Sequence, residues 1–115
     1  GLSEEAQEAL KGTQVRADFS GTVSEVLREL ETQLGGRLRF SLKLHQPKLP
    51  SRYERRGHFE EPQLDLRLPG KPNAEMALKY VLFAGGLTPE KSERKMVMKL
   101  RGRTVWVPDE STVDE

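Results

Sequence analysis

Cysteine is absent from this chain of 115 residues, and so are long apolar runs. Without cysteine the chain can form no disulfide, no thiol nucleophile and no thiolate metal site. The longest apolar run, Tyr80 to Ala84, is far shorter than the ~20 residues that span a bilayer. Neither absence fixes a compartment, because a cysteine-free chain suits oxidising and reducing surroundings alike.

The chain has no excess of charge of either sign, because its basic and acidic residues nearly balance and the formal net charge is +1. A near-neutral balance argues against a nucleic-acid binder that uses the whole domain, for which a strongly basic chain is expected. The basic residues nevertheless gather in two stretches. One runs from Lys91 to Arg103, with six Lys or Arg residues against a single acid, Glu93. The other holds a single acid, Glu54, and its basic residues are Arg37, Arg39, Lys43, Lys48, Arg52, Arg55 and Arg56. The acidic residues collect at both ends of the chain.

A strand-helix pattern that ends in Gly-Gly occurs twice. Val15, Ala17 and Phe19 alternate ahead of an amphipathic stretch from Thr22 to Leu34, which Gly35 and Gly36 close. In the second copy the alternating residues are Leu64, Leu66 and Leu68, the amphipathic stretch is 73–84, and Gly85-Gly86 ends it. Period two indicates a half-buried strand, and spacings of three and four indicate a helix. Two βα units are therefore expected to share one core.

Capping signals sharpen these predictions. Thr22 and Glu25 form a capping box, and Asn73 is the expected N-cap of the second helix. A short helix over 3–11 begins at Ser3. Strands are expected over 14–19, over 37–44 with Arg37, Arg39, Ser41 and Lys43 facing outward, and over 63–68. The residues expected to be nearly inaccessible are Leu27, Leu30, Phe40, Leu66, Leu78 and Val81.

The last strands are predicted as a hairpin over 95–107. If Arg101-Gly102 is a two-residue turn, Met98 opposes Val105 and Met96 opposes Val107 on the core face; a three-residue loop would exchange the faces. The segment 45–62 differs from the periodic segments on either side, because its prolines are incompatible with a helix interior and with a central strand. It is expected to be a long inserted loop, pinned by Leu49, Tyr53 and Phe59.

The predicted fold is α+β, in the order βαββαββ, with two helices packed against small sheets and the long loop between the second and third strands. Residues 1–13 are expected to form a short helix and linker, 14–108 the domain, and 109–115 an acidic flexible tail.

With Val15, Phe19, Thr22, the Val26-Leu27-x-x-Leu30 core and Gly35-Gly36, the first half resembles the short N-terminal (STN) domain of secretins and TonB-dependent transducers. The second half is similar through Leu64 to Leu68, Ala77-Leu78, Gly86-Leu87 and the final hairpin. The inserted loop departs from that family, which has a tight link there. The resemblance implies a non-catalytic docking domain of a larger bacterial cell-envelope protein, located in the periplasm or envelope, with no cofactor.

The sequence also offers features that could suggest other functions. No compact metal-site spacing is matched by His45, His58, Glu60 and Glu61, so we expect no metal site. The serines lie at positions typical of helix caps, helix faces and turns, so we expect no serine catalysis. The basic loop 43–58 offers a second function, as a nucleic-acid or polyanion binding module.

The predicted partner is another envelope protein or an extended acidic segment added as a strand. The candidate partner-binding residues are Arg37, Arg39, Lys43, Arg52, Tyr53, Arg55, Arg56 and Trp106.

Overall fold

The computed structural model describes residues 1–45, 57–59, 61–101 and 104–106, and the side chains of 1–43 and 61–100. Within them lie three helices, α1 (Glu4–Gly12), α2 (Val23–Gln33) and α3 (Ala74–Gly85). Helix α1 begins at the N-cap Ser3, as predicted, and buries Ala6, Ala9 and Leu10. These residues belong to the same core cluster as those of α2 and α3, so α1 is part of the folded body.

Helices α2 and α3 begin and end as the sequence predicts. The Thr22 hydroxyl accepts from the Glu25 amide and the Glu25 carboxylate accepts from the Thr22 amide, both at 3.2 Å, which completes the capping box. The Asn73 side chain accepts from the Met76 amide at 2.9 Å. Gly86 follows α3 with φ 63°, a left-handed conformation that glycine adopts without strain.

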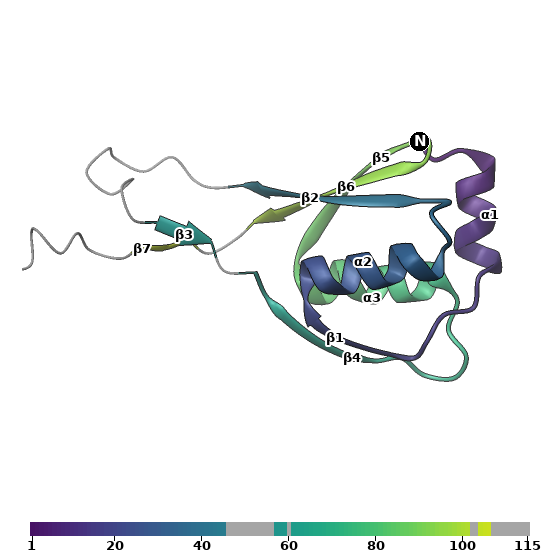
Figure 1. Cartoon of the computed structure of the whole chain (residues 1–115), viewed down its shortest axis with the longest axis horizontal. Coiled ribbons are helices and arrows are strands. Elements are labelled where there is room, and N and C mark those ends of the chain that lie inside the picture. The colour runs from purple at the N-terminus through teal and green to yellow at the C-terminus, as the bar shows by residue number, and fades with distance from the viewer. Residues whose placement is uncertain (46–56, 60, 102–103, 107–115) are drawn as a thin grey trace, which may run out of the picture.

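In the described part of the chain seven strands form three small sheets. Strands β1 (Asp18–Thr22) and β4 (Gln63–Arg67) pair antiparallel. The largest sheet has the order β2-β6-β5, from β2 (Arg39–His45), β6 (Lys95–Arg101) and β5 (Leu87–Ser92). In it β2 runs parallel to β6, and β5 runs antiparallel to β6. The third sheet pairs β3 (Gly57–Phe59) with β7 (Thr104–Trp106) and lies beyond one end of the body (Figure 1).

The body has three layers, because α2 and α3 lie between the β1-β4 pair and the β2-β6-β5 sheet (Figure 1). The apolar stripes of both helices belong to one buried core cluster. Helix α1 closes one end of the helix layer (Figure 1). Leu27, Leu30, Leu78 and Val81 are buried, as predicted. Phe40 and Leu66 are only half-buried, so the prediction that they are nearly inaccessible is wrong. Among the described strands, β2 and β4 each have a neighbour on one side only.

The predicted terminal hairpin is wrong. Strand β6 makes its hairpin with β5, where Met98 opposes Pro89 and Met96 opposes Lys91. Val105 opposes His58 in the separate β3-β7 pair, and Val107 lies outside the described residues. The physical reason is that β2 and β5 already occupy both sides of β6. Met96 and Met98 are buried all the same, because each strand keeps its alternation whatever its partner.

The first strand is shifted from its expected position, and β3 and β5 are strands that the predicted order βαββαββ does not contain. The first strand is Asp18–Thr22 instead of 14–19, although Val15 is buried and its amide donates to the Pro72 carbonyl at 3.0 Å. The segment 45–62 contains β3, a strand that proline density did not suggest. Leu49 and Tyr53 lie outside the described residues, and the side chain of Phe59 is not described.

The two βα units are arranged with approximate two-fold symmetry. Strands β1 and β4 run antiparallel, α2 and α3 run in opposite directions, and β2 and β5 flank β6 in opposite directions. Each helix therefore lies beside one outer strand of the three-stranded sheet, α2 near β2 and α3 near β5. This arrangement creates two grooves, one at each edge of the sheet.

Candidate functional site

The first groove lies along the outer edge of β2. The Arg39 amide donates to the Arg94 carbonyl at 2.8 Å, so the backbone of Arg39 points toward β6. Backbone groups alternate in direction along a strand, and those of Phe40 and Leu42 therefore point away from the sheet. The Phe40 amide donates to the Glu31 carboxylate of α2 at 3.1 Å. Among the described strands none pairs with this edge, which leaves the Leu42 backbone facing outward.

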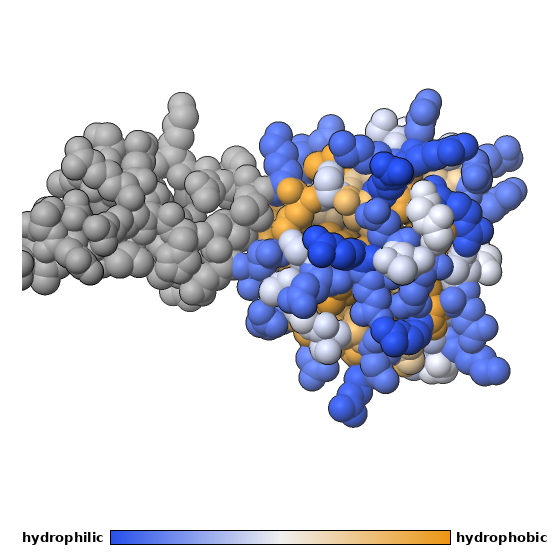
Figure 2. Space-filling view, in the orientation of Figure 1, coloured by the Kyte–Doolittle hydropathy of each residue, from blue (hydrophilic) through white to orange (hydrophobic). Residues whose placement is uncertain are grey.

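Side chains of α2 and β2 line this groove, which we call the β2 groove and which has a volume of about 220 Å³. Its lining residues are Ser24, Leu27, Arg28, Glu31, Phe40 and Leu42. Leu27 is buried below it, and Phe40 and Leu42 are half-buried along its wall. Figure 2 shows apolar surface on the side where β2 passes above α2 in Figure 1, next to the mainly hydrophilic surface of α2. An exposed strand edge next to apolar side chains is the arrangement that accepts an added strand.

A basic surface covers the outer face of the same sheet. Because β2 and β6 run parallel and in register, Arg39 lies beside Lys95, and Lys43 lies beside Lys99. All four side chains are exposed, and we call them the basic sheet face. Lys99 is also 3.1 Å from the carboxylate of Glu90 on β5. Like charges on neighbouring strands are mutually destabilising, so an anion bound here would relieve repulsion within the sheet.

The structure places the candidate partner-binding residues in different surroundings. Arg39 and Lys43 face outward, as predicted. Arg37 is exposed too, but its guanidinium donates to the Leu34 carbonyl at 2.9 Å and to the Thr13 hydroxyl at 2.8 Å, so it fastens the end of α2 to the segment before β1. Arg52, Tyr53, Arg55 and Arg56 lie outside the described residues. The backbone of Trp106 opposes Gly57 in the β3-β7 pair, and its side chain is not described.

Two residues of the basic sheet face were missed by the sequence reasoning. Lys95 and Lys99 join Arg39 and Lys43 only because β6 pairs with β2, which the predicted hairpin did not allow. The available signal was the alternation of lysine with methionine from Lys95 to Lys99, which marks one polar and one buried face of a strand.

Glu61, whose spacing from His45 and His58 matches no compact metal site, has a capping role in the structure. Its carboxylate accepts from the Ser24 amide at 2.9 Å and from the Ser24 hydroxyl at 2.5 Å, at the positively polarised first turn of α2. Glu60 and the side chains of His45 and His58 are outside the described set. Among the side chains that are described, no three His, Cys, Asp or Glu residues come close enough to hold a metal ion.

Among the described side chains one ionisable group has a shifted pKa, and it lies away from the basic sheet face. The Arg16 guanidinium hydrogen-bonds to the Glu29 carboxylate of α2, and this bond raises the pKa of Arg16. The Arg16 amide also donates to the Gln33 side chain at 2.9 Å. Arg16 therefore fastens the segment before β1 to α2.

No helix in the described part of the chain is both long and apolar enough to cross a membrane. Comparison of the sequence with protein-family models and with curated proteins, and of the structure with solved structures, gives no match.

Proposed function

We propose that this protein is a non-catalytic interaction domain that binds an extended acidic segment of a partner as an added strand along β2. The observation that carries the proposal is the combination, on one strand, of an outward-facing backbone, an apolar groove and an exposed row of cations. Backbone hydrogen bonds would supply affinity, and the alternating side chains of the ligand would supply selectivity.

Alternation in the bound segment would match the two surfaces. Side chains on one side of the segment would enter the groove beside Phe40 and Leu42, where apolar residues fit. Side chains on the other side would lie next to Arg39 and Lys43, where carboxylates fit. The preferred ligand is therefore a strand that alternates apolar with acidic residues. The resemblance to STN domains supports a docking role in a larger protein of the bacterial cell envelope.

The alternative is a polyanion or nucleic-acid binding module. The observation in its favour is that the basic sheet face adds Lys95 and Lys99 to the cations that the sequence had placed near the loop. A polyanion would be held by charge alone, with steep dependence on salt, and would need no contact with the β2 backbone. The groove beside Phe40 and Leu42 favours the peptide strand.

A peptide of about ten residues that alternates glutamate with valine tests the proposal. We expect it to slow hydrogen exchange of the Leu42 amide and to shift the backbone resonances of β2. Arg39→Glu/Lys43→Glu should weaken binding roughly tenfold, since charge selects this ligand. Arg67→Glu/Lys71→Glu, an equal charge change at exposed positions in and just after β4, is the matched control and should bind within about twofold of the original protein.

Two outcomes would overturn strand addition. A peptide methylated on alternate backbone nitrogens keeps its charge but loses its donors, so unchanged affinity for it would exclude pairing with β2. Tighter binding of a random single-stranded oligonucleotide than of the peptide would favour the alternative. The melting temperature of Arg39→Glu/Lys43→Glu should not fall, because the change removes like-charge pairs with Lys95 and Lys99.

A further inference from the structure

The second groove runs along β5, and we call it the α3-β5 groove. It is larger than the β2 groove and is lined by different side chains. It has a volume of about 540 Å³, within the range of small-molecule sites, and lies between α1, α3 and β5. Its floor is apolar and comes from α1 and the residues before it, from α3 and from β6: Leu2, Leu10, Leu78, Leu82 and Met96. Leu10, Leu78 and Met96 are buried members of the core, and Leu2 and Leu82 are half-buried beside them, so the bottom of the groove is formed by carbon atoms at the edge of the core.

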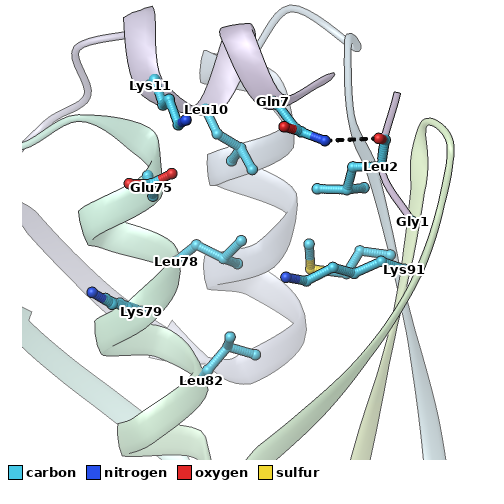
Figure 3. A pocket seen from close by; sticks show the side chains of 11 residues that line it. Gly1, Leu2, Gln7, Leu10, Lys11, Glu75, Leu78, Lys79, Leu82 and Lys91 are labelled. Carbon is cyan, nitrogen blue, oxygen red and sulfur yellow. Dashed lines mark hydrogen bonds between the residues drawn. The ribbon is translucent and has the colours of Figure 1, made fainter. Parts of the chain in front are cut away.

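The rim of this groove is mainly cationic. Lys11 of α1, Lys79 of α3 and Lys91 of β5 line it together with one carboxylate, Glu75. Figure 3 shows the Lys91 side chain stretched across the groove from β5 toward Leu78, with its ammonium group over the apolar floor. Gln7 closes the side next to α1, where its amide donates to the Leu2 carbonyl at 2.9 Å. A ligand that covers the leucines would place its polar end beside Lys91.

The backbone of β5 is poorly suited to an added strand. The Ser3 amide donates to the Glu93 carbonyl at 2.9 Å and the Glu93 amide donates to the Gly1 carbonyl at 2.8 Å, so residues 1–3 already occupy this edge next to Glu93. By alternation, Lys91 and Pro89 are the next residues whose backbones face outward. Pro89 has no amide hydrogen to donate, which blunts the edge. This groove is therefore a poor site for a peptide strand.

We propose that the α3-β5 groove binds a single-chain carboxylate of the fatty-acid class. The alkyl chain lies over Leu10, Leu78 and Leu82, and the carboxylate pairs with the Lys91 ammonium group. Lys11 and Lys79 contribute to a positive potential that attracts an anion and disfavours a cation. Charge complementarity together with an apolar floor selects this ligand over a purely polar anion and over a neutral hydrocarbon. The site is separate from the β2 edge, and the inference does not depend on the function proposed there.

Sodium decanoate, used below its micelle concentration, is the probe. Titration followed by methyl and amide NMR should shift the resonances of Leu10, Leu78, Leu82 and Lys91 and leave those of Leu27 and Leu42, in the β2 groove, unchanged. Each CH₂ added between octanoate and decanoate should tighten binding roughly two- to fourfold, because the chain leaves water. Acetate, which has the charge without the chain, should not bind measurably.

Two variants separate charge from apolar contact. Lys79→Glu/Lys91→Glu should weaken decanoate binding about tenfold or more, and Leu82→Glu, which installs the residue type that α2 carries at the corresponding Glu31, should weaken it similarly. Arg28→Glu/Lys71→Glu makes the same charge change at exposed positions outside this groove and should bind decanoate as the original protein does. Melting temperatures check that every variant is folded.

Three results would overturn the inference. Decyltrimethylammonium binding as tightly as decanoate at the same leucines would show that charge has no part. Affinity unchanged in Lys79→Glu/Lys91→Glu would remove the lysines from the site. Equal shifts at Leu27 and Leu42 would mean non-specific adsorption. Because the glutamate-valine peptide is followed at the Leu42 amide, failure of the decanoate experiment leaves the test of strand addition unaffected.

Discussion

Helices α2 and α3 have buried faces of the same apolar character, but their outer faces differ in polarity. Aligned on their N-caps, Thr22 and Asn73, they bury an equivalent stripe, in which Leu27 corresponds to Leu78. The outer face of α2 is polar and carries Glu25, Glu29 and Thr32. The corresponding residues of α3 are Met76, Tyr80 and Phe83, which are 40%, 43% and 92% exposed. A helix that is apolar on both faces is usually covered on both, whereas α3 has an uncovered outer face in this structure.

This difference shows at which positions both halves need apolar residues and at which positions the residue type can vary. The inner stripes face one shared core, so both helices need apolar residues at the same spacing. Positions beside the sheet edges are under no such requirement. Glu31 of α2 accepts from the Phe40 amide, while its counterpart in α3, Leu82, lines an apolar groove. One repeated scaffold therefore carries two grooves of different chemistry.

Truncation of the shared inner stripe should have the largest effect on stability. We expect Leu27→Ala and Leu78→Ala each to lower the free energy of unfolding by ~2–5 kcal/mol, as for large-to-small changes in packed cores. Leu27 is 3% exposed and Leu78 is 6% exposed and borders the α3-β5 groove, so Leu78→Ala should fall in the lower part of that range. Chemical denaturation measures both. A loss under about 1 kcal/mol in both variants would mean that the two faces are wrongly assigned.

Local signals in the sequence were enough to predict the helices. Thr22, Asn73 and Gly86 mark their ends through hydrogen bonds and backbone conformations that involve only near neighbours. The α+β class and most of the buried residues follow from periodicity alone.

Strand pairing could not be predicted in the same way, because it joins residues far apart in the chain. The sequence around Leu87 to Ser92 is polar and contains Pro89, so β5 went unrecognised. Its pairing with β6, and the parallel contact of β6 with β2, depend on which strand occupies each side of β6. Two of the four cations of the basic sheet face and both grooves follow from that pairing. The candidate site was therefore only half predictable, through Arg39 and Lys43.

The N-caps provide a second, smaller comparison of the halves. Thr22→Ala and Asn73→Ala should each destabilise the protein by ~0.5–2 kcal/mol, the usual cost of removing a capping side chain. Asn73 also donates from its amide nitrogen to the Lys11 carbonyl at 3.2 Å, which joins α1 to α3. Asn73→Ala should therefore cost more than Thr22→Ala, and hydrogen exchange should rise in α1 as well as in α3. Equal losses, with α1 unaffected, would show that the bond to Lys11 contributes nothing to stability.

An exchange of outer-face residues should have the smallest effect. Phe83→Thr gives α3 the residue that α2 carries at the corresponding position, and Thr32→Phe makes the reverse change. Because Phe83 is 92% exposed and Thr32 is exposed on α2, each variant should change the free energy of unfolding by less than about 0.5 kcal/mol. Thr32→Phe also removes the hydrogen bond from the Thr32 hydroxyl to the Arg28 carbonyl at 3.0 Å, a bond within the helix that adds little to stability. Denaturation curves compare the two variants with the original protein. A loss of 2 kcal/mol or more in Phe83→Thr alone would show that Phe83 is covered in solution, and that the apolar outer face of α3 is a contact surface which the polar outer face of α2 does not share.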